Sequence, residues 1–155
     1  MTKQVTSFNG VKVILSRPYA YVATDSGVDI VDLITETNYA STALNGASSM
    51  VYTGDALYVG TTASGIYKWD LATLSGGINY NCMQQYAWTG STPPLMHDQI
   101  VDMSSCGRVV LASTVSGVEC VVNTSSGTLS TVYHYHTDNG SRACHMDGQS
   151  SIYYT

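Results

Sequence analysis

The chain has 155 residues, of which 44% are hydrophobic and 11% are charged, and its formal net charge is −5. This length and hydrophobic share suffice for one domain with its own core. The six Lys and Arg residues are scattered, which excludes the clustered basic surface that nucleic-acid binding requires. No apolar stretch approaches the roughly 20 residues of a membrane-spanning helix. The first residues lack an apolar core, so we expect no signal peptide and a cytoplasmic or virion-associated protein.

The first part of the chain predicts four short strands. Residues 11–15 form an apolar run, residues 19–33 contain two runs separated by a Ser26-Gly27 turn, and residues 37–42 form a looser polar strand. Two runs of β-branched and aromatic residues around a Gly-containing turn are typical of a β-hairpin. The glycine suits a turn position that disfavours other residues. This segment therefore predicts a small antiparallel sheet.

A second unit follows with the same order of features. Residues 49–52 and 57–71 repeat the strand and the hairpin, with the turn at Ser64-Gly65, and residues 79–88 supply a polar fourth strand. Residues 89–98 contain Pro93-Pro94 and no strand pattern. We interpret them as a loop insertion, and such loops often form the binding face of a repeat protein.

A third unit and the start of a fourth complete the chain. Residues 99–103, 109–123 and 129–136 repeat the pattern around Ser116-Gly117, and residues 143–146 and 152–154 begin another copy. The three hairpins align without a gap, with the turn glycines spaced 38 residues (27 to 65) and 52 residues (65 to 117) apart. Units of about 40–50 residues with four strands each have the size of a propeller blade. No window has a helical apolar stripe, so we predict an all-β fold of four-stranded antiparallel sheets.

The second unit carries a family resemblance. Its Leu-Tyr-Val-Gly-Thr, Gly-Ile-Tyr and Trp-Asp segments within residues 57–71 resemble the blades of two-component-regulator and quinoprotein-like β-propellers. The resemblance implies one β-propeller-like domain over residues 1–155, with 3.5 blades per chain. Blade 1 is expected at about 11–46, blade 2 at about 47–97, blade 3 at about 98–140 and a half blade at 141–155.

A half blade leaves a ring of strands incomplete, because propellers typically close with about four to eight blades. We expect a homo-oligomer in which two chains close one ring of seven or eight blades. The alternatives are that residues 4–8 complete the half blade as an outer strand, or that the chain is an open arc on a larger assembly. Unpaired strand edges favour association. The candidate edge residues are Val5, Phe8, Ile152, Tyr153 and Tyr154.

Candidate catalytic and metal-binding residues are sparse. His134 and His136 lie two apart on a predicted strand, on one face, and His145 follows, so these three are a weak candidate metal site beside the simpler interpretation as polar outer-strand residues. No G-x-S-x-G motif occurs. The cysteines form no C-x-x-C pair and are expected as free thiols. We therefore expect no cofactor, no bound metal and no enzyme activity.

Aromatic side chains near the long loop are the candidate binding residues: Trp69, Tyr80, Tyr86 and Trp88. Aromatic rings beside a Gly/Ser/Thr/Pro loop can stack on a sugar or anchor a protein partner, although packing between blades would also use them. The favoured function is a non-catalytic propeller module for assembly and recognition, in the setting of a virion or phage-type structural or tail surface protein. The alternative is a carbohydrate-binding, lectin-like propeller. A metal-dependent enzyme is the third and least favoured hypothesis.

Overall fold

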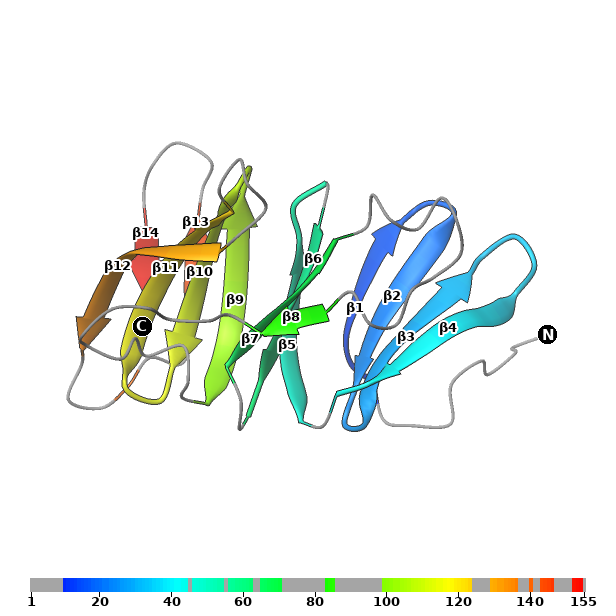
Figure 1. Ribbon diagram of the computed structural model, residues 1–155, viewed down its shortest axis with the longest axis horizontal. Helices are drawn as coiled ribbons and strands as arrows, with labels where there is room; N and C mark the ends of the chain where they lie inside the picture. The colour runs from blue at the N-terminus through cyan, green and yellow to red at the C-terminus, as the bar shows by residue number, and fades with distance from the viewer. Residues whose placement is uncertain are drawn as a thin grey trace.

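The computed structural model of the chain is a row of antiparallel β-sheets (Figure 1). It describes residues 10–44, 46–54, 56–62, 65–70, 83–85, 99–123, 129–136, 140, 143–146 and 152–154. In this part of the chain every regular element is a strand, and no helix long and apolar enough to cross a membrane occurs.

Three of the sheets have four strands, and each sheet keeps the order of its strands along the chain. Blade 1 consists of β1 (Gly10–Ser16), β2 (Tyr19–Thr24), β3 (Gly27–Asp32) and β4 (Thr37–Ala43). Blade 2 consists of β5 (Ala47–Tyr52), β6 (Ala56–Thr61), β7 (Ile66–Asp70) and β8 (Met83–Gln85). Blade 3 consists of β9 (Ile100–Cys106), β10 (Val109–Thr114), β11 (Gly117–Asn123) and β12 (Leu129–His136). Blade 4, as described, is the two-stranded sheet of β13 (Cys144–Met146) and β14 (Ile152–Tyr154).

These sheets confirm the predicted all-β fold of four-stranded antiparallel blades. Short hairpin connections force neighbouring strands to run antiparallel, and the first strands β1, β5, β9 and β13 pack successively against one another. In Figure 1 blades 1, 2 and 3 stand side by side in chain order from right to left, and the red strands of blade 4 lie behind blade 3. The first strand of each blade therefore belongs to a common inner layer.

A threonine hydroxyl bonds within the hairpin turn of each four-stranded blade, and in blade 3 the Thr114 hydroxyl accepts from the Ser116 amide at 3.1 Å. The Thr24 hydroxyl donates to the Gly27 carbonyl at 3.1 Å and the Thr61 hydroxyl donates to the Gly65 carbonyl at 3.0 Å. The turn from Thr61 to Gly65 is one residue longer than the turn from Thr24 to Gly27. The gapless alignment of the hairpins is therefore wrong at this turn: the second strands align on their threonines, with a one-residue insertion before Gly65.

Each blade has two faces, because side chains alternate along a strand. We call the face toward the preceding blade the leading face and the face toward the following blade the trailing face. Between blades 1 and 2, residues on the trailing face of blade 1 pack against residues on the leading face of blade 2. This buried cluster consists of Tyr21, Ala23, Val28, Ile30, Ala47, Met50, Leu57 and Val59.

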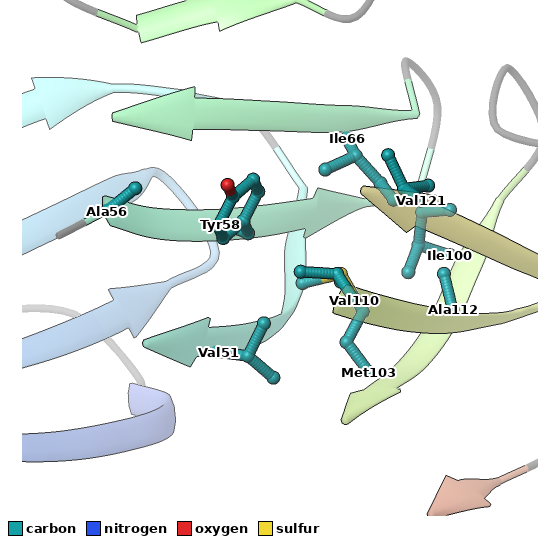
Figure 2. Close-up of a cluster of buried hydrophobic side chains, with 9 residues drawn as sticks. All are labelled: Val51, Ala56, Tyr58, Ile66, Ile100, Met103, Val110, Ala112 and Val121. Carbon is teal, nitrogen blue, oxygen red and sulfur yellow. The ribbon is translucent and has the colours of Figure 1, made fainter. Parts of the chain in front are cut away.

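The same arrangement recurs between blades 2 and 3. Figure 2 shows this cluster of nine buried side chains: Val51, Ala56, Tyr58, Ile66, Ile100, Met103, Val110, Ala112 and Val121. Between blades 3 and 4 the buried cluster is smaller, with Leu111, Val118, Cys120 and Cys144. The core is therefore a series of apolar layers between blades, each with a leading and a trailing side.

Candidate functional site

The predicted aromatic site lies largely outside the described residues. This applies to Tyr80, Tyr86 and Trp88. Trp69 lies in β7, where its backbone pairs with Leu57 on one side and Met83 on the other, and its side chain is outside the described part. The candidate aromatic site stays a prediction.

The candidate histidines fall on two different blades. In β12, His134 pairs with Glu119 and His136 pairs with Gly117, whereas His145 lies in β13 of blade 4 and is exposed. Among the side chains that the structure describes, no three His, Cys, Asp or Glu residues form a group able to hold a metal ion. The described residues thus provide no geometry for the metal site.

The candidate edge residues divide in the same way. Val5 and Phe8 lie outside the described residues. Ile152, Tyr153 and Tyr154 form β14, whose described partner is β13 of the same sheet. Their role in assembly stays a prediction.

A feature that the sequence interpretation missed is the leading face of blade 1. Val11, Val13 and Leu15 alternate along β1, and their exposed fractions are 52%, 56% and 69%. The intervening Lys12 and Ile14 face blade 2: Ile14 packs against the buried cluster between blades 1 and 2, and Lys12 bonds to Ser49. The consecutive apolar residues Val13, Ile14 and Leu15 were the available signal, because a strand with apolar side chains on both faces is typically covered on both faces.

The other blades show what normally covers this face. The residue two positions before the turn threonine is equivalent in the three blades. It pairs with a residue of the first strand, and these pairs are Val22 with Val13, Val59 with Met50, and Ala112 with Met103. Met50 and Met103 are buried against the preceding blade, whereas Val13 is exposed. Val13 therefore occupies a position that elsewhere in this chain forms a contact between blades, and Val11 and Leu15 are exposed beside it.

A polar chain connects the inner strands of all four blades. The Lys12 ammonium lies 3.3 Å from the Ser49 hydroxyl and 3.5 Å from a carboxylate oxygen of Asp102. The Ser49 hydroxyl donates to Asp102 at 3.4 Å and accepts a hydrogen bond from the Met103 amide at 3.0 Å. The Cys144 amide donates to the second carboxylate oxygen of Asp102 at 3.4 Å. These bonds fix the register between neighbouring inner strands, so Lys12 and Asp102 have a structural role.

Two of the described cysteines, Cys120 and Cys144, are packing residues between blades 3 and 4. Cys106, Cys120 and Cys144 are free thiols, as expected from the sequence. Burial raises the pKa of Cys120 and, with the nearby Asp102 carboxylate adding to the effect, the pKa of Cys144. The Cys144 thiol lies 3.3 Å from the Leu111 carbonyl. A raised pKa keeps these thiols neutral at pH 7, which is the opposite of what a nucleophilic cysteine requires.

Comparisons with known proteins rest on structure. No family model matches the sequence, and no curated protein matches it. The computationally designed Ika4 protein is similar, with a TM-score of 0.71 and 9% identity over 99% of each chain.

Two further similar structures are longer than this chain. The WD40 repeats of RRP9 match with a TM-score of 0.74 and 10% identity, over 97% of this chain and 46% of that chain. BamB from Moraxella catarrhalis matches with a TM-score of 0.64 and 12% identity, over 92% of this chain and 39% of that chain. This chain thus spans less than half the length of either protein. Similarity at this level of identity shows a fold and leaves function open: the chain has the β-propeller fold.

Proposed function

We propose that this chain is a non-catalytic β-propeller module for assembly and recognition, and that its contact surface is the leading face of blade 1. The observation that supports this function most strongly is the exposure of Val13 at the position that Met50 and Met103 bury in blades 2 and 3, with Val11 and Leu15 exposed beside it. Contiguous exposed apolar side chains typically mark a protein interaction surface. The three residues lie on one face of one strand, so a partner covers them together.

The described polar groups support a structural rather than a catalytic role. Lys12, Ser49 and Asp102 bond to one another and to backbone groups of neighbouring inner strands. The turn threonines bond to their own hairpins. A nucleophile needs a base within hydrogen-bond reach, and in the described polar chain the Ser49 hydroxyl bonds to Lys12, Asp102 and the Met103 amide rather than to a histidine. The described part of the chain therefore favours binding over catalysis.

Two finer predictions concern the setting of the module. Low charge and an abundance of Tyr, Ser, Thr and Gly support a virion or phage-type structural or tail surface protein. Tyr80, Tyr86 and Trp88 are the basis of the carbohydrate-binding alternative. Hits on a glycan array that Trp88→Ala abolishes would support that alternative, and an array without hits would count against it.

The proposed function is tested by measuring native mass by light scattering over a wide range of protein concentration. We expect the mass of the unmodified chain to rise above 16.6 kDa with concentration, and Val13→Glu to remain at 16.6 kDa because its carboxylate would be buried unpaired in the contact. Ile34→Glu is the matched control, since Ile34 is an exposed apolar residue in the turn after β3. Identical mass profiles for the unmodified chain and Val13→Glu would overturn the proposal.

A further inference from the structure

Blade 4 is at the other end of the series of blades from the exposed leading face of blade 1, because β13 packs against β9 and β10 of blade 3. In β13, Cys144 and Met146 pack toward blade 3. Alternation along the strand turns His145 the other way, and His145 is exposed. In the register of blade 4, His145 pairs with Tyr153.

Tyr153 occupies a position that recurs in the repeat. Tyr21 pairs with Ile14 in blade 1, Tyr58 pairs with Val51 in blade 2, and Tyr153 pairs with His145 in blade 4. Tyr21 and Tyr58 are both buried, each in the cluster between its own blade and the following blade. Blade 4 thus repeats, at its trailing position, the residue type that blades 1 and 2 bury against a following blade.

We propose that the partner of the open face is a second copy of this chain, bound head to tail: the leading face of blade 1 in one copy packs on the trailing face of blade 4 in the other. This inference rests on the proposed function and adds the identity and orientation of the partner. The arrangement continues the contact already present between blades 1 and 2, blades 2 and 3, and blades 3 and 4. One chain therefore carries both halves of the interface, on opposite ends.

The number of blades favours two copies. A head-to-tail contact is heterologous, and it generates a ring when the rotation closes. The described residues of each chain form three four-stranded sheets and one two-stranded sheet, so two copies bring eight sheets, which is within the range of about four to eight blades at which propellers close. A third copy would exceed this range. The expected assembly is a ring of two chains with two identical interfaces.

The experiment uses one charged variant on each half of the interface. Val13→Glu alters the leading face and His145→Glu alters the trailing face, and both residues are exposed in the single chain. We expect each variant to keep the circular dichroism and thermal unfolding midpoint of the unmodified chain. Each should raise the dissociation constant of the dimer at least about tenfold, measured by light scattering. Should His145→Glu fail to fold, His145→Lys tests the same position.

Mixing the two variants distinguishes the orientation. In the mixture, the Val13→Glu chain has an intact trailing face and the His145→Glu chain has an intact leading face, so one unaltered interface forms. We expect twice the 16.6 kDa mass in the mixture at high concentration, while each variant alone stays a monomer. A mixture that remains monomeric would contradict the head-to-tail contact.

Other outcomes identify other partners. Loss of the dimer in Val13→Glu but not in His145→Glu would indicate that two leading faces meet, which overturns this inference and keeps the proposed function. A dimer that neither variant disturbs would place the contact elsewhere and overturn both. An unmodified chain that stays at 16.6 kDa at every concentration would also overturn both.

Discussion

Small residues determine how closely neighbouring blades approach. Gly60 lies on the trailing face of blade 2, and a Cβ added there would overlap the Ile100 side chain, with the Ile100 Cβ only 2.9 Å away. The equivalent residue of blade 1 is Ala23, which is fully buried in its own contact. The contact between blades 2 and 3 thus has a glycine where the contact between blades 1 and 2 has an alanine, and the β-branched Ile100 fills the space that Gly60 leaves.

Gly60→Ala should destabilise the chain by about 1–3 kcal/mol, because the added methyl group overpacks the contact between blades 2 and 3. Urea unfolding followed by circular dichroism measures this change. Thr62→Ala, at an exposed position two residues later, is the control and should remain within about 0.5 kcal/mol of the unmodified chain. Equal unfolding midpoints for Gly60→Ala and the control would show that Ile100 moves aside at no cost.

At the residue scale the sequence predicted the turns better than the surfaces. Ser-Gly pairs marked the hairpins correctly because glycine and small polar residues are the residues that such turns accept. The exposure of Val13 could not be predicted, since an apolar residue in a strand gives no sign of whether a neighbouring blade covers it. The extra residue between Thr61 and Gly65 was also missed, because aligning the glycines hid it.

The inner strands are held together by a polar chain as well as by apolar packing. Asp102 is its central acceptor, with the Lys12 ammonium, the Ser49 hydroxyl and the Cys144 amide around its carboxylate. Removing an acceptor leaves its donors without a partner, which costs more than removing a solvated charge. The two ends of the ion pair are therefore not equivalent.

Asp102→Ala should destabilise the chain by about 1–3 kcal/mol, whereas Lys12→Ala should cost no more than about 1 kcal/mol because the pair is partly exposed to solvent. Denaturant titrations measure both free energies of unfolding, and the two can be compared when the slope of the free energy against denaturant concentration is the same for both variants. The effect of Lys12→Ala should shrink at high salt, as expected for a screened pair. A larger loss for Lys12→Ala than for Asp102→Ala would show that the ion pair, not the amide and hydroxyl donors, dominates.

Strands were easier to predict than their faces. The strand expected at residues 129–136 is β12, with the same limits, while the strand expected at residues 79–88 is described only as β8 (Met83–Gln85). Which residues share a face depends on register, and a shift of one residue exchanges the two faces of a strand. The gapless alignment would have made Leu15, rather than Ile14, the counterpart of Val51. The residues on the leading and trailing faces of each blade could therefore be identified only from the register of the paired strands.

The stability of the whole molecule is expected to vary along the row of blades. Blades 2 and 3 have buried clusters on both faces, whereas blade 1 has a described cluster on its trailing face alone. In repeat architectures, stability is approximately a sum of unit and neighbour contributions. The middle blades should therefore open least often.

Hydrogen–deuterium exchange read by mass spectrometry should show the slowest exchange in β6 and β10 at low protein concentration, and faster exchange in β1. Raising the concentration should slow exchange in β1 and β13 specifically, because these strands form the proposed contact between copies. Uniform protection across all blades, independent of concentration, would contradict both the ranking and the contact.

The longer turn between Thr61 and Gly65 has a consequence for how this molecule tolerates changes in length. Despite the additional residue, the Thr61 hydroxyl still bonds to the Gly65 carbonyl. The side chains of the strands before and after the turn remain on the same faces of the sheet as in the other blades. The chain can thus gain residues at a hairpin tip without disturbing the layers between blades, whereas the same gain inside a strand would turn its apolar side outward. The tips are accordingly the natural places to graft a foreign peptide for display.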